Sequence, residues 1–265
     1  MADRAGADID RCVSWMRPVL FGAIGMSGLL LFWTGMALWL RGGGGAISRL
    51  PTPLAAGREL LDYAGGGLWR DLAASLEVFL AGWAIGSVAA AVIGIMIGRS
   101  RVFAGLFGPV VEAIRPVSSI AWVPLAVVWF GFGFSSKIFL VGLAVFLVVI
   151  VYAVDGSRRI PADLERTASM LGMTPLQRFR ALVLPGALTE ILIGARVALM
   201  SGWGTVIVAE LVAADFGLGA RLIAVQQSYD VAAVMATMIC FGLSGFVMNA
   251  AFTALESRLL PWRPR

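Results

Sequence analysis

The chain has 265 residues, of which 59% are hydrophobic and 14% are charged, and its mean hydropathy is +0.88. Soluble domains carry about 25% charged residues, so this composition excludes an ordinary soluble protein and predicts a polytopic membrane protein. The net charge of +5 is not gathered in a basic stripe, and arginines flank the apolar runs, which favours membrane topology over nucleic-acid binding. Because the chain has no histidine, His-ligated metal sites and Ser-His-Asp catalysis are excluded.

The N-terminal part predicts one membrane span and one external loop. Residues 1–18 form a polar tail, and residues 19–40 form an uncharged run. A run of this length can cross about 30 Å of hydrocarbon and is too long for a signal-peptide core. Residues 41–71 contain a glycine run and two prolines, which predicts an external loop with a short surface helix near residues 54–63.

A second span is predicted at residues 72–97, and it ends in arginines that place this end in the cytoplasm. Small residues recur along it every four positions, at Gly82, Gly86, Ala90 and Gly94. Small residues at this spacing allow two helices to pack closely in a membrane. The repeat therefore predicts a structural contact rather than a ligand site.

The third apolar region, residues 102–134, is a broken span. Pro116 and Pro124 each remove a backbone donor, and such breaks are tolerated at membrane depth only when buried in protein or lining a wet cavity. Residues beside the break are therefore candidates for a translocation pathway; they are Ser118, Ser119 and Trp122. Glu112 and Arg115 are three positions apart, so they either pair with each other or serve the pathway.

A fourth span at residues 138–154 leads into a polar and basic loop at residues 155–190. Within it, Gly172 permits the positive φ that ends a first short helix. Thr174 follows as an N-cap, with Pro175 at the first helical position and Gln177 completing a capping box, so a second short helix begins at once. The pattern predicts two helices joined at a sharp glycine corner, with Met170 near its tip.

The fifth span is predicted at residues 191–213 and the sixth at 231–254, with an external loop at 214–230 between them. Arg196 lies near the cytoplasmic end, where it either snorkels to lipid phosphate or attracts an anion. The same helix would face the pathway with polar and aromatic side chains and close near the outer surface; these residues are Ser201, Trp203, Thr205 and Glu210.

Two sets of motifs resemble the membrane subunits of bacterial ABC importers. Gly172, followed after nine residues by Leu-Val-Leu-Pro ending at Pro185, resembles the cytoplasmic EAA loop of that family. The family's Glu is Arg166 here, and the specific role of that Glu is not assigned to Glu165, which lies one position earlier. The stretches RPVSSIAWVPLAVVWFGFGFSSK and GWGTVIVAELVAADFGLG are similar to the taurine, sulfonate and nitrate branch, although the second proline of the first pattern is Ser118.

The resemblance implies an all-α fold of six transmembrane helices with a cytoplasmic coupling helix, the type I ABC importer permease fold. It also implies that the loop docks on an ATPase subunit through these residues: Glu165, Arg166, Thr167, Ala168, Met170, Leu171, Gly172, Met173, Thr174 and Pro185. The chain has no GxxxxGK[ST] phosphate loop, so we expect ATP and Mg to bind the partner ATPase and no cofactor to bind this chain.

The implied assembly contains two permease copies, two ABC ATPase subunits and a periplasmic or lipid-anchored substrate-binding protein. We expect a multi-pass protein of the bacterial inner membrane, in contact with lipid and not nucleic acid, with both termini in the cytoplasm. Most of the 21 Lys and Arg residues fall in segments that this topology places in the cytoplasm.

Two other classes are compatible with the sequence. An ion-coupled secondary transporter would use intramembrane carboxylates such as Glu77, Glu112 and Glu210, but no inverted repeat is visible. A membrane scaffold or enzyme would need features that the chain does not display. For an importer, Arg115 and Arg196 fit a small anion, and the resemblance favours taurine or another sulfonate, with nitrate, bicarbonate and an aromatic acid open.

Overall fold

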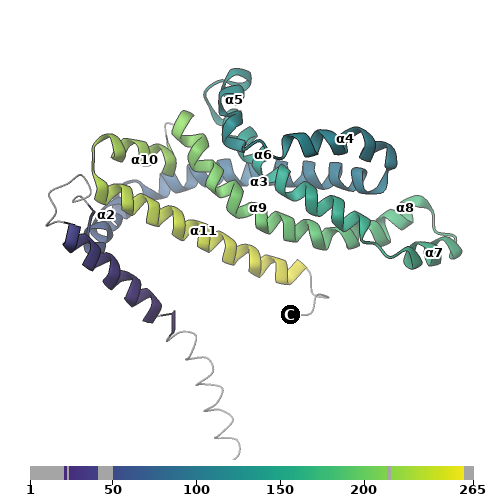
Figure 1. The fold of residues 1–265 in the computed structure, drawn as a ribbon, viewed down its shortest axis with the longest axis horizontal. Coiled ribbons are helices and arrows are strands. Elements are labelled where there is room, and N and C mark those ends of the chain that lie inside the picture. Colours follow the sequence, from purple (N-terminus) through teal and green to yellow (C-terminus); the bar gives the residue numbers. More distant parts are fainter. Residues whose placement is uncertain (1–20, 23, 41–49, 214–215, 260–265) are drawn as a thin grey trace, which may run out of the picture. The chain divides into compact units, whose positions relative to one another are not determined.

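The computed structural model describes residues 21–22, 24–40, 50–213 and 216–259. These residues are helical nearly throughout, with no strand among them (Figure 1). The expected N-terminal tail, residues 1–18, lies outside the described part, as do residues 19, 20 and 23 of the expected first span. The chain divides by its contacts into two compact units, residues 1–66 with 225–236 and residues 67–224 with 237–265.

Four described helices are long and apolar enough to cross a membrane: Leu68–Arg99, Phe134–Arg158, Pro175–Val212 and Val231–Arg258. Arg101–Ile114 and Ser119–Phe130 form a pair bent by 94°, which makes a fifth crossing if the pair is one span. This bend lies in the region where the two prolines predict a broken span. A shorter apolar helix, Ile24–Leu40, lies where the first span is expected.

The first unit contains Ile24–Leu40, helix α2 (Pro53–Gly66) and the junction of α10 (Leu218–Gln227) with α11 (Val231–Leu259). The indole of Trp33 donates a hydrogen bond to the Pro51 carbonyl at 3.1 Å, which fixes the chain entering α2 to the preceding helix. Asp230 caps α11 by accepting from the Ala233 amide at 3.0 Å. The segment expected as an external loop at 214–230 thus contains the helix α10.

The second unit is built around three long helices that lie side by side in Figure 1: α3 (Leu68–Arg99), α6 (Phe134–Arg158) and α9 (Leu184–Ala213). The predicted small-residue face of α3 is confirmed, because Gly82, Gly86 and Gly94 are buried against α6. A Cβ on Gly94 would stand 2.5 Å from the Ala153 Cβ, and one on Gly86 would overlap the Gly142 carbonyl. Only glycine allows the two backbones to approach this closely.

Two tryptophan side chains join α9 to α3 and to α11, each through one hydrogen bond. Trp83 on α3 donates from its indole to the Ala195 carbonyl on α9 at 3.0 Å. Trp203 on α9 donates to the Phe241 carbonyl on α11 at 3.1 Å, and its ring is stacked on that of Phe241 with centroids 4.6 Å apart. A buried indole N–H needs such an acceptor, so the two tryptophans fix the relative register of the helices.

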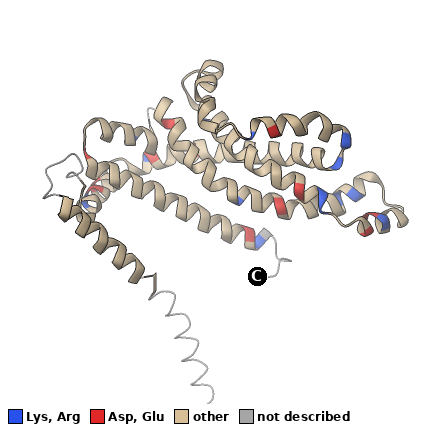
Figure 2. Cartoon of the chain, viewed as in Figure 1, with Lys and Arg blue, Asp and Glu red and all other residues tan. Residues whose placement is uncertain are grey.

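The remaining elements of this unit surround the three long helices. α4 (Arg101–Ile114) returns beside α3 after the turn at Ser100, and η2 (Ser119–Trp122, a 3-10 turn) leads into α5 (Val123–Phe130). α7 (Ala162–Met170) and α8 (Pro175–Arg178) follow α6 and precede α9, and they lie together at one end of the unit (Figure 1). Charged residues on α7, α8 and the α3–α4 turn are coloured at this end in Figure 2.

Candidate functional site: the coupling corner and the broken span

The segment from Ala162 to Val183, which we call the coupling corner, begins with a helix that ends in a Schellman motif. The Met173 amide donates to the Ala168 carbonyl and the Gly172 amide to the Ser169 carbonyl, both at 3.1 Å. Gly172 has φ of +70°, the left-handed conformation that this motif requires at the residue after the cap. The sequence-based prediction that Gly172 ends this helix is confirmed.

A capping box starts the next helix immediately. The Thr174 hydroxyl accepts from the Gln177 amide at 3.3 Å, and the Gln177 side chain accepts from the Thr174 amide at 2.8 Å. Pro175 occupies the first helical position, where its missing N–H leaves nothing unsatisfied. The predicted corner is confirmed, and hydrogen bonds on both sides of it restrict how the two helices can turn relative to each other.

The sequence suggested a short second helix that ends before the fifth span. In the structure this helix instead continues into the span. Helical structure continues from Pro175 to Val212 over 38 residues. It passes through η3 (Phe179–Val183), a π-helical turn in which the Leu184 amide donates to the Phe179 carbonyl. Pro185 has no N–H to donate to Ala181 and its ring crowds that carbonyl, and a wider turn relieves both problems without breaking the helix.

Side-chain contacts hold the corner in place. Glu165 forms an ion pair with Arg99 at the end of α3, with 2.6 Å between Oε1 and Nη2. Within the corner, Arg178 donates from Nη1 to the Ser169 hydroxyl at 3.2 Å, which joins α8 to α7. Ala168 is the buried residue of α7. Sequence reasoning missed Arg99, whose only signal was a charge at the end of a span.

The rest of the predicted coupling residues lie on the exposed side of the corner. Arg166 forms a solvent-exposed ion pair with Asp163 at 3.6 Å, and Thr167 donates back to the Asp163 carbonyl at 2.8 Å. Met170 is 86% exposed and Leu171 is 74% exposed. Two large apolar side chains at the tip of a hydrogen-bonded turn form a surface that a protein partner could cover.

At the broken span, polar side chains of two elements meet. Ser118 caps η2 by accepting from the Ile120 amide at 3.4 Å. The hydroxyls of Ser119 and Thr205 lie 3.4 Å apart, which joins the break to α9, and Thr205 also donates to the Ser201 carbonyl at 2.9 Å. Trp122 packs against a small buried cluster of Ala126, Leu140 and Ala209, and its indole nitrogen reaches no acceptor among the described residues.

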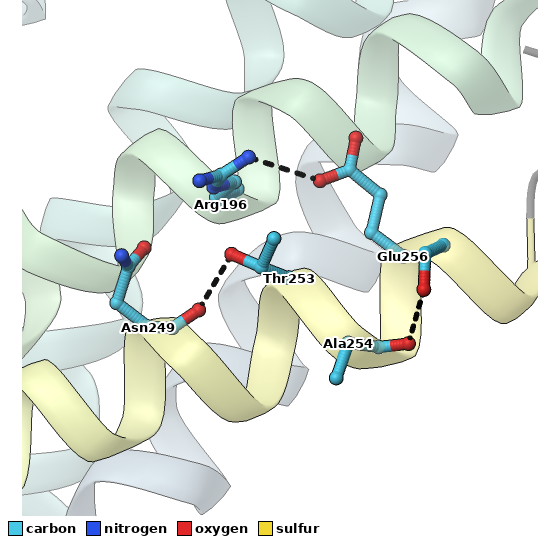
Figure 3. A network of polar contacts seen from close by, with 6 residues as sticks. Arg196, Asn249, Thr253, Ala254 and Glu256 are labelled. Atoms are coloured by element: carbon cyan, nitrogen blue, oxygen red, sulfur yellow. Dashed lines mark hydrogen bonds and ion pairs between the residues drawn. The ribbon is translucent and has the colours of Figure 1, made fainter. Parts of the chain in front are cut away.

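The two intramembrane arginines have different surroundings. Arg196 points across to Glu256 on α11, with 3.4 Å between Nη1 and Oε2, where Figure 3 draws the pair beside Thr253. It therefore pairs within the protein, whereas the sequence suggested lipid phosphate or an anion. Arg115 forms no ion pair with Glu112 among the described residues, and it lines two cavities of about 400 and 540 Å³ that both include Asp155.

Three residues expected on the pathway are buried within the single chain: Trp203, Thr205 and Glu210. Trp203 is part of the aromatic contact with Phe241 and Phe79. Glu210 is 1% exposed; it accepts from the Ser75 hydroxyl at 2.7 Å and from the Gly219 amide at 2.8 Å. The Ser75 hydroxyl in turn accepts from the Leu218 amide at 2.9 Å. The carboxylate thus fixes the start of α10 to α3, and Ser75 gave no signal in the sequence.

The all-helical fold, its apolar spans and a rigid exposed corner between two of them define a polytopic membrane protein of the permease class. Among the described residues no group of three Asp, Glu or Cys side chains could hold a metal ion. The family model for the inner membrane component of binding-protein-dependent transport systems matches residues 86–261. The chain therefore belongs to that family.

Relatives and solved structures agree with this assignment. The chain is 36% identical over 219 residues to the taurine transport system permease protein TauC of Escherichia coli, covering 80% of each chain. It is 33% identical to the putative aliphatic sulfonates transport permease protein SsuC of Bacillus subtilis, covering 90% of this chain and 88% of the relative. A structure of the MetNI methionine ABC transporter matches with a TM-score of 0.63 and 17% identity, covering 72% of this chain and 95% of that chain.

These findings establish the chain as the permease subunit of an ABC importer and a multi-pass protein of the inner membrane. They favour this function over the ion-coupled transporter and the membrane enzyme. The fold agrees with the expected all-α permease fold. Family membership also implies an ATPase, a substrate-binding protein and pairing of permease subunits.

Proposed function

We propose that this permease imports a small organic anion, a sulfonate such as taurine, and that the coupling corner receives the energy of ATP hydrolysis from a separate ATPase subunit. The observation that supports the energy input is the corner itself. Its two helices are fixed by the Schellman motif at Gly172 and the capping box at Thr174, while Met170 and Leu171 are exposed beside them. A fixed turn transmits a push from a partner, whereas a flexible loop would absorb it.

The helical continuity from Pro175 into α9 extends this argument to the pathway. A displacement of the corner moves a helix that carries Ser201 and Thr205, and Thr205 contacts Ser119 at the break. The ion pair between Glu165 and Arg99 conveys the same displacement to α3. In the proposed assembly two permease copies, two ATPase subunits with ATP and Mg, and an external binding protein act together, with both termini and the corner on the cytoplasmic side.

The proposed solute class is supported by the named relatives and by Arg115. The relatives transport taurine and aliphatic sulfonates by their names. Of the two intramembrane arginines, Arg196 is engaged by Glu256, while Arg115 lines two cavities beside the broken span and forms no ion pair among the described residues. An arginine open to a cavity suits a tetrahedral oxyanion.

The docking proposal is tested by copurifying the ATPase subunit with the permease in detergent. We expect Met170→Asp to abolish retention of the ATPase, because a charge would replace an apolar contact at the tip of the corner. Leu61→Asp in α2 is the matched control, since Leu61 is an exposed leucine remote in sequence from the corner. Retention by Met170→Asp equal to that of the control would rule out docking through the corner.

The solute proposal is tested with the complete importer in proteoliposomes. ATP hydrolysis should be stimulated by the binding protein loaded with taurine or an alkanesulfonate, and less by nitrate, bicarbonate or an aromatic acid. Arg115→Gln should reduce transport while ATPase retention stays normal. Stimulation by one of the other anions alone would replace the sulfonate assignment and leave the docking result untouched.

A further inference from the structure

A cavity of about 450 Å³ lies behind the coupling corner, between the α3–α4 turn and the helix that begins at Pro175. This volume is within the range of about 300–1,000 Å³ that ligand sites occupy. None of its residues is needed for the Ser119–Thr205 contact at the broken span. The side chains that define its chemistry are Met96, Arg99, Phe103, Glu165, Arg178 and Phe179.

The charges around this cavity leave one cation uncompensated. Arg99 and Glu165 neutralise each other at 2.6 Å. Arg178 donates from Nη1 to the neutral Ser169 hydroxyl, forms no ion pair among the described residues, and its Nε is buried without an acceptor. A buried N–H of a charged group without an acceptor is costly, so this side of the cavity favours an anionic oxygen.

The opposite wall of the cavity is apolar and continues along α4. Phe103 is stacked on Phe107 with ring centroids 5.7 Å apart, and Val102 and Leu106 on the same helix are largely exposed. The cavity also lies at the turn where α3 ends at Arg99 and α4 begins at Arg101. Figure 2 colours basic positions at this end of the two helices. Such a place is where lipid headgroups meet acyl chains.

We propose that this cavity binds an anionic phospholipid, with the phosphate at Arg178 and an acyl chain along Phe103 and Phe107. A lipid bound there touches both the α3–α4 turn and the start of the helix that leaves the corner. It therefore braces the coupling corner against α3, and neither Met170 nor Leu171 lines its cavity. The inference concerns a lipid site and holds whichever solute the importer carries.

The test measures which lipid stays with the purified full chain. The permease is delipidated in detergent, incubated with equal amounts of phosphatidylglycerol and phosphatidylcholine, repurified, and its bound lipid is quantified by mass spectrometry. We expect wild type to prefer phosphatidylglycerol and Arg178→Gln to lower that preference about fivefold, which corresponds to about 1 kcal/mol for one basic group at a membrane surface. Arg178→Lys should retain most of the preference because it keeps the charge.

Arg180→Gln is the matched control, because Arg180 lies two residues further along the same helix, is exposed and lines a different groove beside Gly172. It should bind lipid like wild type. Leu182→Trp fills the cavity without changing charge and should also lower the bound phosphatidylglycerol, which keeps the test valid if Arg178→Gln inserts poorly. Equal loss in Arg180→Gln, no preference in wild type, or displacement of the lipid by inorganic phosphate alone would each overturn the lipid assignment.

Discussion

The coupling corner and the junction of α9 with α10 are two turns between helices, and they are held in opposite ways. At the corner the bonds are local: residues 168 to 173 close one helix and residues 174 to 177 open the next. At the junction, Glu210 and Ser75 bring two distant segments together around the Gly219 and Leu218 amides. The first turn is largely exposed, whereas Glu210, Ser75 and Leu218, which hold the second, are buried.

The difference separates the part that we propose contacts the ATPase from the part that holds the helix bundle together. The turn that carries the exposed Met170 and Leu171 gains little from burial, so it depends on backbone and capping hydrogen bonds. A buried turn excludes water, so each of its polar groups needs a partner inside the protein. We therefore expect changes at the junction to affect stability most, and changes at the corner to affect docking at small cost in stability.

Glu210→Ala should have the largest effect on stability. It leaves the Ser75 hydroxyl and the Gly219 amide without their shared acceptor, at about 1–3 kcal/mol for each buried group. When the variant is unfolded in mixed micelles, its free energy of unfolding should be about 3 kcal/mol lower than that of wild type. Glu77→Ala, which removes an exposed carboxylate from α3, is the control and should lie within about 0.5 kcal/mol of wild type.

Ser75→Ala tests the same junction from its other side, because the Ser75 hydroxyl donates to Glu210 and accepts from the Leu218 amide. Alone it should lower the free energy of unfolding by about 1–3 kcal/mol. Combined with Glu210→Ala it should cost less than the sum of the two changes, since each removes the other's partner. Additive losses would show that the two side chains act separately.

Gly172→Ala should have an intermediate effect that is confined to the corner. Apart from its neighbours in the chain, no atom of the described residues lies within 4 Å of the added Cβ. The cost is therefore that of a left-handed backbone for an L-residue, about 1–2 kcal/mol. The variant should insert normally and lose part of its ATPase retention. Gly86→Ala is the contrasting variant, because the new Cβ would overlap the Gly142 carbonyl of α6. This variant should lower the stability of the helix bundle whether or not the ATPase is bound.

Thr174→Ala should have the smallest effect on stability, about 1 kcal/mol, through loss of the capping box. Thr174→Ser keeps the hydroxyl and should behave like wild type. Copurification of the ATPase should weaken only in the alanine variant. If the alanine variant instead unfolds the whole permease, the corner is not the local structure that its hydrogen bonds indicate.

The corner could be predicted in detail because glycine, threonine, proline and glutamine act there on their own neighbours. The helix end at Gly172 and the start at Thr174 need no knowledge of the rest of the chain. The continuation of the second helix through a π-helical turn could not be predicted, because Pro185 alone indicates a break. The surrounding helix decides whether a break or a wider turn accommodates the proline.

The sequence by itself determined the membrane class, the positions of the main apolar helices, the glycine face of α3 and the coupling corner, since each follows from composition or from spacing within one segment. Only the tertiary structure decided that Glu210 binds Ser75, that Arg196 pairs with Glu256, and that Glu165 is held by Arg99. These pairs join residues far apart in the chain. A spacing pattern within one helix cannot specify which side chain of another helix will stand opposite, because helix packing chooses that partner.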